Sequence, residues 1–198
     1  MMLIDSVLEH LDLEQIETNL FRGIPEALGP SRVFGGQVIG QALIAALRTI
    51  EGRPCHSLHG YFLRPGDPSI PIIYEVDRIR DGKSFTTRRV IAIQKGEAIF
   101  NMSASFQVFE DGLSHQIEMP DVPRPDDLPT EEEMFEKRKK NMTPEMITMM
   151  TRDRPVEMKR VEDIDYLNPV KSDPVQHIWF KSKKKLGDDP AQHQCLLA

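Results

Sequence analysis

The stretch Val38–Leu47 constrains the fold most, because it is apolar on nearly every side and only Gln41 interrupts it. A surface helix carries a single apolar stripe, so a helix of this composition is expected to be buried almost all round. Gly35-Gly36 provides a flexible start, and Gly52-Arg53-Pro54 closes the segment. The chain must therefore fold so that other elements surround one central helix.

Four strand-like runs follow this helix. They span 56–64, 72–80, 84–94 and 98–108. The second run ends at Asp81-Gly82, a dipeptide typical of hairpin turns, and the third ends at Lys95-Gly96. In the last run apolar and polar side chains alternate, which is the period of a half-buried strand. A buried helix followed by an antiparallel meander predicts an α+β hot-dog fold. The sheet curls around the helix because no other element is there to cover it.

The rest of the chain predicts a division into three parts. Residues 1–110 form an N-terminal hot-dog domain, 111–152 a Pro-rich linker with short helices, and 153–198 the start of a second, incomplete hot-dog domain. The elements expected outside the meander are a helix at 5–20, a strand at 19–23, two short helices between 130 and 152, strands at 154–161 and 176–182, and a helix at 191–198.

Composition excludes several classes of function. A net charge of −6 argues against a general nucleic-acid-binding protein, which usually presents a basic face. No apolar run approaches the ~20 residues that span a bilayer, and the N-terminus lacks the basic and apolar regions of a signal peptide. Cys55 and Cys195 provide neither a disulfide framework nor the spacing of metal ligands. We expect an intracellular protein with no metal, no membrane span and no nucleic-acid partner.

Four stretches of the chain resemble one known family. They are LFRG at 20–23, FGGQVIGQAL at 34–43, HSLHGYFLRPGD at 56–67, and the region from Arg80-Asp81-Gly82 to Ala104-Ser105-Phe106-Gln107. The chain thereby resembles the type II acyl-CoA thioesterases, bacterial and peroxisomal enzymes with two hot-dog domains in one chain. The resemblance implies an acyl-CoA substrate, no cofactor apart from the coenzyme A of the substrate, and a homo-oligomer, a dimer or higher. It also implies a peroxisomal location in a eukaryote and a cytoplasmic one otherwise.

The same resemblance implies where the catalytic groups belong. Family members are expected to use an Asp, a Ser or Thr, and a Gln to position a water molecule against the thioester. All three would lie in the second domain, beyond Ala198, the residue at which this sequence stops within an apolar helix. The resemblance therefore predicts the activity for a full-length form and leaves that of the 198-residue chain undecided.

The turn Gly35-Gly36-Gln37 is the first candidate for substrate binding. It precedes the central helix, where backbone N–H groups and the helix dipole favour an anion or a polarised carbonyl. In a hot-dog thioesterase this position suits the acyl carbonyl. The alternative interpretation is that the glycines only allow a tight approach to a buried helix, and that Gln37 and Gln41 are hydrogen-bonded core groups.

His56 is the candidate general base, because a histidine titrates near neutral pH. A structural strand histidine is the alternative. His56 and His59 lie three apart on a strand and are expected on opposite faces, which disfavours a shared metal. Arg64 belongs to a basic group of residues in the meander that suits the phosphates of coenzyme A, although exposed strand arginines are common. The side chains expected along an acyl tunnel between helix and sheet are Phe100, Met102 and Phe106.

Three functions follow from these observations. The leading one is hydrolysis of fatty acyl-CoA thioesters to free fatty acid and coenzyme A, at least in a full-length form. The second is a catalytically inactive, truncated product that acts by association with a partner hot-dog chain through an exposed sheet edge. The third is an enoyl-CoA hydratase-like hot-dog enzyme, which would need an acid/base pair that the surroundings of His56 do not offer.

Overall fold

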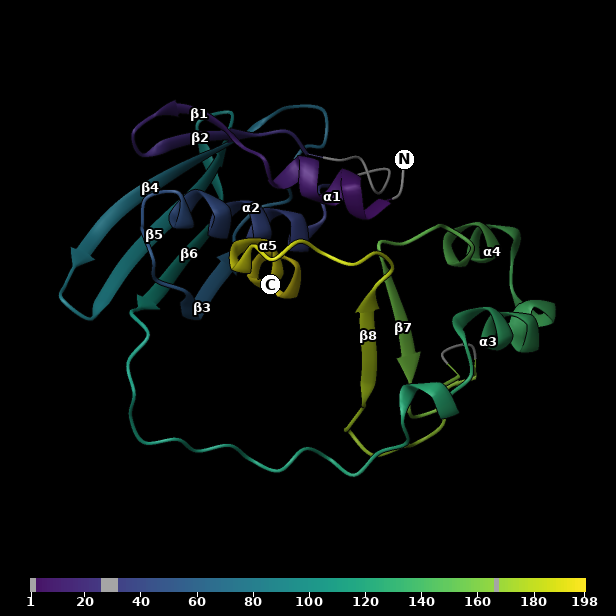
Figure 1. Ribbon diagram of the computed structural model, residues 1–198. Helices are drawn as coiled ribbons and strands as arrows, with labels where there is room; N and C mark the ends of the chain where they lie inside the picture. Colours follow the sequence, from purple (N-terminus) through teal and green to yellow (C-terminus); the bar gives the residue numbers. More distant parts are fainter. Residues whose placement is uncertain (1–2, 26–31, 166–167) are drawn as a thin grey trace. The chain divides into compact units, whose positions relative to one another are not determined.

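The structure is a computed structural model that describes residues 3–25, 32–165 and 168–198 (Figure 1). Its contacts divide the chain into two compact units. One unit comprises Met1–Asp5 and Leu113–Lys185, and the other comprises Ser6–Gly112 and Leu186–Ala198. The domain boundaries predicted at 110 and 152 stay a prediction. None of the helices in the described residues has the length and apolar character needed to cross a bilayer.

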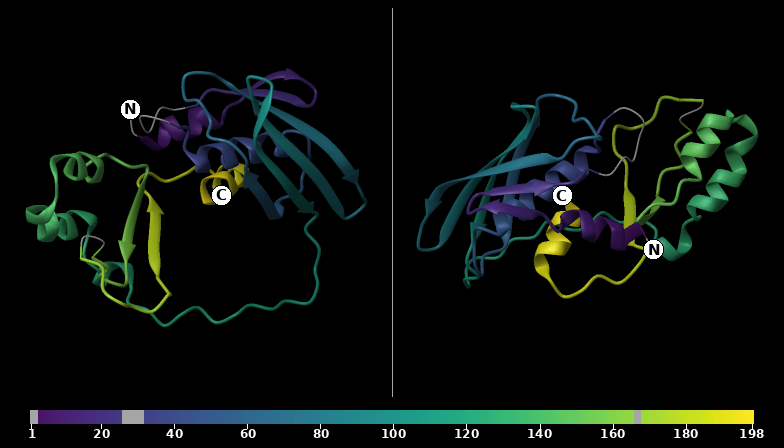
Figure 2. Two further views of the ribbon diagram at one scale, coloured as in Figure 1. Left: turned by 180° about the vertical axis from the view of Figure 1, so that it is seen from behind. Right: turned by 90° about the horizontal axis from the view of Figure 1, so that it is seen from above.

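The unit formed by residues 6–112 and 186–198 contains a curved antiparallel sheet wrapped against one helix (Figures 1 and 2). The helix is α2, Gly35–Leu47. The strand order is β1-β2-β4-β5-β6-β3, so β1 and β3 are the edge strands. The strands are β1 Glu14–Glu17, β2 Leu20–Gly23, β3 Cys55–Phe62, β4 Ile72–Asp81, β5 Phe85–Gln94 and β6 Glu97–Gln107.

Side-chain alternation places the core between α2 and the sheet. Along β6 the buried residues Phe100, Met102, Ala104 and Phe106 face α2. On α2 itself residues are buried on all sides from Val38 to Ala46, apart from the half-buried Ile39. The predicted buried helix, the four-strand meander and the hot-dog arrangement are therefore confirmed. The β4–β5 connection at Asp81-Gly82 is a hairpin, in which Asp81 still pairs with Thr86 and the Gly82 N–H donates to the Phe85 carbonyl at 2.8 Å. Lys95-Gly96 forms a tighter hairpin, since both residues have positive φ, as a two-residue type I′ turn requires.

The N-terminal helix is shorter than predicted. α1 spans Leu3–Leu11, and the expected helix at 5–20 gives way to the β1–β2 hairpin. The helical interpretation was wrong because β2 would otherwise leave its backbone unpaired at the sheet edge. Residues 14–17 cover that edge as a strand, and Glu14 lies directly opposite Arg22 and forms an ion pair with it.

Two buried polar side chains fasten α2 to its surroundings. The Gln41 amide donates to the carbonyl of His10 at 2.5 Å and accepts from the Tyr74 hydroxyl at 2.8 Å. At the other end of α2, the Arg88 guanidinium is 1% exposed. It donates to the hydroxyl of Thr49 at 2.8 Å and to the exposed carboxylate of Asp81 at 2.6 Å. A cation at a helix C-terminus is also favoured by the helix dipole.

The helix α5, Pro190–Leu197, belongs to the same unit and packs against α2. The side-chain amide of Gln194 accepts from the Cys55 backbone N–H at 3.2 Å and donates to the Cys55 carbonyl at 2.9 Å. It therefore completes the backbone hydrogen bonds at the start of the edge strand β3. Burial raises the pKa of the Cys195 thiol to about 12, so this thiol is a packing group and not a nucleophile.

The other unit is built on a two-stranded hairpin. The strands β7, Val156–Arg160, and β8, Ile178–Ser182, pair antiparallel. The helices α3, Glu131–Arg138, and α4, Pro144–Met150, are separated near Thr143-Pro144 as predicted. Two 3₁₀ turns complete the unit, η1 at Pro125–Asp127 and η2 at Lys139–Asn141. The predicted strands at 154–161 and 176–182 and the helix at 191–198 are confirmed with small changes in their ends.

Two adjacent arginines on β5 provide a matched test of this packing. Arg88→Met should lower the free energy of unfolding by about 3 kcal/mol, because it removes a buried donor from several acceptors. Arg89→Met should change it by less than about 1 kcal/mol, because Arg89 is half exposed and pairs with the exposed Asp77. Urea unfolding of both variants measures the difference. Equal effects would contradict the assignment of Arg88 as an anchor.

Candidate functional site

The first turn of α2 begins after Phe34, a residue whose side chain cannot accept a hydrogen bond from the backbone N–H groups of the helix. The N-cap residue is Phe34, and it makes no side-chain capping bond. The turn is Gly35-Gly36-Gln37, so backbone can be approached closely there. The Gln37 amide donates to the Ile24 carbonyl at 3.1 Å and holds the chain that leaves β2. This helix end therefore has the polarity that suits a carbonyl oxygen as it gains negative charge.

Two aromatic rings explain why the turn has glycines. A Cβ added to Gly35 would lie 2.9 Å from the Phe62 ring, and one added to Gly36 would lie 2.5 Å from the Phe34 ring. The rings thus rest directly on the backbone of the first turn. Phe34 and Phe62 are 58% and 56% exposed, although both are large apolar side chains. An exposed aromatic pair beside a polarised helix end is the main surface feature here.

One ring of the exposed pair, Phe62, contacts a ring of the buried core. The Phe62 and Phe100 rings lie 4.8 Å apart between centroids at an angle of 43°, and Phe100 is 1% exposed. Gly60 makes this possible, because a Cβ there would lie 2.6 Å from the Phe100 ring. Of the predicted tunnel residues, Phe100 is therefore close to the turn. Met102 and Phe106 lie further along β6 and are fully buried against the core. Their contact with an acyl chain stays a prediction.

Arg64 lies at the same end of the unit as the turn. The loop that carries it is joined to the chain before α2, because the Val33 N–H donates to the Gly66 carbonyl at 2.9 Å. The Arg64 guanidinium donates to the Ala98 carbonyl at 2.8 Å and lies 3.6 Å from Glu97. Its side chain is half exposed, so it keeps donors for a ligand. Arg64 and the turn thus form one group of predicted residues.

His56 lies apart from that group. Its Nε2 is 2.9 Å from the Ser105 hydroxyl and its ring contacts Phe85, and both neighbours belong to the outer face of the sheet. Six residues of strand separate His56 from Phe62, which corresponds to about 20 Å. The expectation that His56 and His59 face opposite sides was wrong. A bulge between Cys55 and Ser57 adds one residue to β3 and turns His56 outward, onto the face that His59 occupies.

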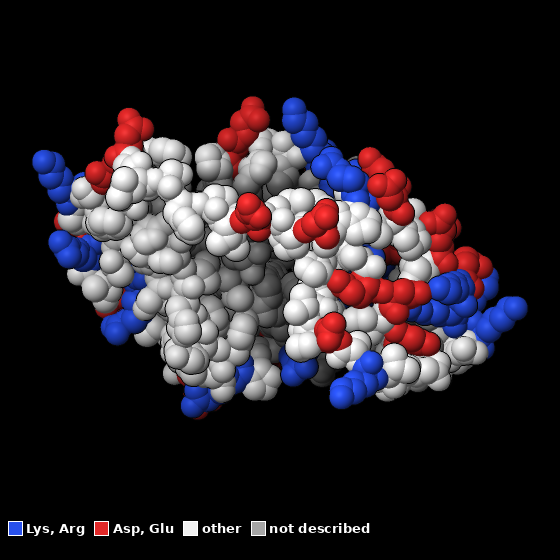
Figure 3. Space-filling view, turned by 90° about the horizontal axis from the view of Figure 1, so that it is seen from below, with Lys and Arg blue, Asp and Glu red and all other residues white. Residues whose placement is uncertain are grey.

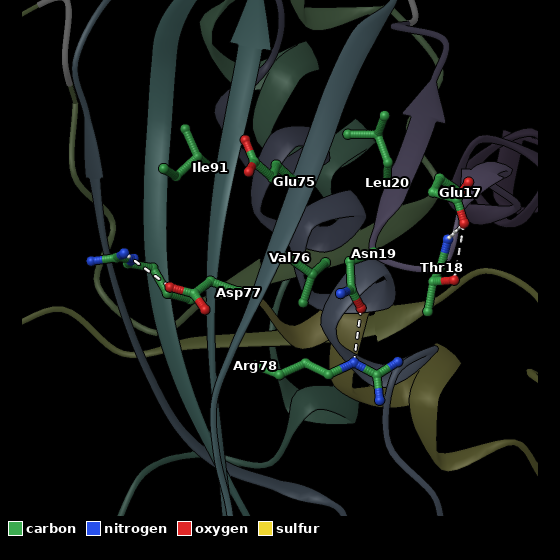
Figure 4. Close-up of a pocket in the computed structure, with 10 residues that line it drawn as sticks. Glu17, Thr18, Asn19, Leu20, Glu75, Val76, Asp77, Arg78 and Ile91 are labelled. Carbon is green, nitrogen blue, oxygen red and sulfur yellow. Dashed lines mark hydrogen bonds and ion pairs between the residues drawn. The ribbon is translucent and has the colours of Figure 1, made fainter.

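A hollow of about 530 Å³ lies on the outer face of the sheet, beside β1, β2, β4 and β5 (Figure 4). Sequence analysis gave no indication of it. Its polar groups are engaged with one another: Arg78 donates to Asn19 at 2.8 Å, and Arg89 pairs with Asp77 at 3.0 Å. None of the predicted site residues lines it. We therefore place the candidate site at the first turn of α2.

In the face shown in Figure 3, basic and acidic side chains lie side by side and do not gather into one broad basic surface. Within residues 3–25, 32–165 and 168–198, no group of three or more His, Cys, Asp or Glu side chains could hold a metal ion. Sequence analysis missed Phe34 and Phe62 as site residues. The sequence did contain an indication of them, since each is a large apolar residue next to a predicted turn or near the end of a predicted strand.

The comparisons identify the class of protein first. An architecture like this one occurs in a hot-dog protein from Alicyclobacillus acidocaldarius, with a TM-score of 0.71 at 20% identity, over 97% of this chain and 68% of that one. A crystal structure described as acyl-CoA thioesterase II TesB2 from Mycobacterium marinum is 42% identical with a TM-score of 0.72, over 96% of this chain and 66% of that one.

The family follows from the sequence relatives. Residues 24–107 match the model of the acyl-CoA thioesterase N-terminal domain. Acyl-CoA thioesterase 2 of Haemophilus influenzae is 39% identical over 197 residues, which cover 99% of this chain and 69% of that protein. Mouse acyl-coenzyme A thioesterase 8 is 37% identical over 95% of this chain and 62% of its own length. The chain belongs to the acyl-CoA thioesterase family, and it spans about two thirds of the length of these relatives.

The loop that carries Arg64 provides a pH-dependent prediction. Hydrogen bonds from the hydroxyl and N–H of Ser69, and then the Lys95 ammonium, lower the pKa of Asp67 from 3.8 to about 2. A lowered pKa means that this carboxylate stabilises the fold above about pH 4, and that the contribution is lost as the pH falls through 2. Titration followed by NMR should give a midpoint near 2 for Asp67. Ser69→Ala should raise the midpoint toward 3.8, and the outer-face control Ser103→Ala should not move it.

Proposed function

We propose that the protein acts in the hydrolysis of fatty acyl-CoA thioesters to free fatty acid and coenzyme A. The observation that carries this proposal is the glycine-containing first turn of α2 beside the exposed Phe34 and Phe62 rings. A thioester has a polar carbonyl attached to a long apolar chain, and this surface offers a partner for each part. Membership of the acyl-CoA thioesterase family supports the same substrate.

The proposed chemistry uses the turn to stabilise charge. Water adds to the thioester carbonyl carbon, and the carbonyl oxygen becomes an oxyanion. Backbone N–H groups of the Gly36-Gln37 turn would hold that oxyanion, where the helix dipole adds to their effect. Collapse of the intermediate breaks the carbon–sulfur bond and releases coenzyme A as its thiol. Arg64, which keeps exposed donors, would contact a phosphate of the coenzyme A.

The attacking water must also be activated by side chains that take its proton and orient it. The resemblance implies an Asp, a Ser or Thr, and a Gln for this role, and the proposal assigns it to none of the residues at the turn. His56 contacts a hydroxyl and an aromatic ring on the outer face, which supports a structural role for it. These contacts also give no support to an enoyl-CoA hydratase, which would need a carboxylate beside a histidine. No cofactor is part of the proposal.

A specific observation favours association as a second function. The edge strand β3 carries no Asp, Glu, Lys or Arg from Cys55 to Phe62, and Leu58 and Phe62 are exposed on its helix-facing side. An uncharged edge with apolar side chains favours pairing with another chain. We propose a homo-oligomer that uses this edge, in an intracellular location that the free thiols of Cys55 and Cys195 support. A peroxisomal or cytoplasmic address stays a prediction.

The aromatic pair can be tested with a thioether analogue of lauroyl-CoA that cannot be hydrolysed. Isothermal titration should show that Phe62→Ala weakens binding by about tenfold or more, because an apolar contact with the acyl chain is lost. Phe109→Ala is the control, since Phe109 is exposed and lies outside the sheet. Thiol release from lauroyl-CoA then measures turnover, and light scattering measures association. A folded chain that neither binds the analogue nor releases thiol would contradict the proposed hydrolysis, and association would then be the remaining proposed function.

Arg64 can be tested by comparing two ligands. Arg64→Gln should weaken binding of the acyl-CoA analogue by about tenfold, because charge-assisted bonds to phosphate are lost. It should leave binding of the matching acyl-pantetheine analogue unchanged, because that ligand lacks the nucleotide phosphates. Arg78→Gln, in the outer hollow, should affect neither ligand. An equal loss for both ligands would show that Arg64 only supports the loop.

A further inference from the structure

A tryptophan and a lysine form a pair of donors on the β7–β8 hairpin. Trp179 on β8 lies directly opposite Lys159 on β7 in the strand register. Residues directly opposite each other in an antiparallel pair project from the same face of the hairpin. Both side chains are partly buried, although the hairpin has only two strands. A segment from elsewhere in the same unit therefore covers this face.

That segment is proline-rich and is held through its backbone carbonyls. The Trp179 indole N–H donates to the Pro123 carbonyl at 3.0 Å. The Lys159 ammonium donates to the Pro125 carbonyl at 2.8 Å and to the Leu128 carbonyl at 3.2 Å. Three carbonyls within six residues are thus bound by one cross-strand pair.

The backbone of the segment combines an extended residue with a tight turn. Arg124 has φ −65° and ψ 151°, which are polyproline II values. In the turn the Asp127 and Leu128 N–H groups donate to the Arg124 and Pro125 carbonyls, and a carbonyl oxygen has a second lone pair, so the Pro125 carbonyl can also accept from Lys159. Pro125–Asp127 then forms a short 3₁₀ turn, and Leu128 is extended again. Prolines restrict φ before binding, so the segment loses less conformational entropy when it docks.

The surface continues beyond the bound carbonyls. A small hollow of about 140 Å³ adjoins the pair, and it is lined by Pro125, Asp126, Glu157, Lys159, Trp179, Phe180 and Lys181. The preceding stretch 113–122 has no helix or strand, and it is exposed in all but one position. Recognition of a proline-containing chain by a groove with aromatic side chains is a recurring mode of peptide binding, and Trp179 and Phe180 are the aromatic residues of this hollow.

We propose that the Trp179–Lys159 face is a binding site for short proline-containing segments, and that residues 123–128 occupy it in cis. The ligand is recognised by its carbonyl spacing and its proline-restricted backbone, so a peptide with the same sequence binds in trans when the cis segment is released. The cis segment has an effective concentration of the order of millimolar, because it is tethered to the site. It therefore excludes weak competitors from the native chain.

The test uses Trp179 as its own reporter, because it is the single tryptophan of the chain. In the 198-residue double variant Pro123→Ala/Pro125→Ala, the cis segment should leave and the emission of Trp179 should shift to longer wavelength. A synthetic peptide of residues 120–129 should then reverse the shift saturably. The same peptide with both prolines replaced by alanine should bind about tenfold more weakly. Circular dichroism checks that the variant is folded, and the single variant Pro123→Ala replaces it if it is not.

A lysine pair provides the matched control. Adding Lys159→Met to the proline double variant should weaken binding of the peptide by about tenfold, since two hydrogen bonds from a charged donor are lost. Adding Lys183→Met should not weaken it, because Lys183 is exposed, pairs with Asp153 at 2.6 Å and does not line the hollow. Unchanged emission in the double and single proline variants would overturn the role of the prolines. If the Trp179 emission shifts in the proline variants but the peptide does not bind at millimolar concentration, the proposal of a binding site is overturned.

Discussion

The buried amide of Gln41 is the interaction on which the rest of the larger unit depends. It is the polar interruption of an otherwise apolar stretch, and it joins α2 to the end of α1, the residue after β2 and the first part of β4. Burial raises the pKa of Tyr74, so its hydroxyl stays a donor to Gln41. Gly23 is needed for the approach, because a Cβ there would lie 2.5 Å from the Gln41 oxygen. A helix with only apolar contacts could rotate or slide, whereas these directional bonds hold one orientation.

That orientation determines the candidate site. With Gln41 bonded toward His10 and Ile24, the first turn of α2 comes to lie under the Phe62 ring, and Gln37 reaches the Ile24 carbonyl as well. Arg88 holds the opposite end of the helix through Thr49. The helix end that would stabilise an oxyanion is therefore positioned by buried bonds at some distance from it. The surface near the turn can then stay apolar and exposed.

Much of the fold was predictable from local patterns. The all-round apolar character of 38–47, the alternation along 98–108 and the Lys95-Gly96 turn each indicated the element that the structure contains. The helix expected at 5–20 was wrong in its second half, because the pairing of 14–17 with β2 outweighs the helical tendency of the segment. Of the predicted site residues, Gly35, Gly36, Gln37 and Arg64 lie at one end of the unit and their contact with a substrate stays a prediction, while a bulge that no pattern indicates turned His56 to the outer face of the sheet.

The sequence by itself determined the family, the buried helix and the faces of the meander strands, because these depend on the order and periodicity of residues along short stretches. Only the tertiary structure decided which side chains meet across long separations. It set Phe62 on Gly35, Gln194 on the backbone of Cys55, and Trp179 with Lys159 on the carbonyls of 123–128. Each of these contacts depends on where two distant elements pack. The order of residues along a short stretch does not indicate which distant element it will meet, because that is set only when the core packs.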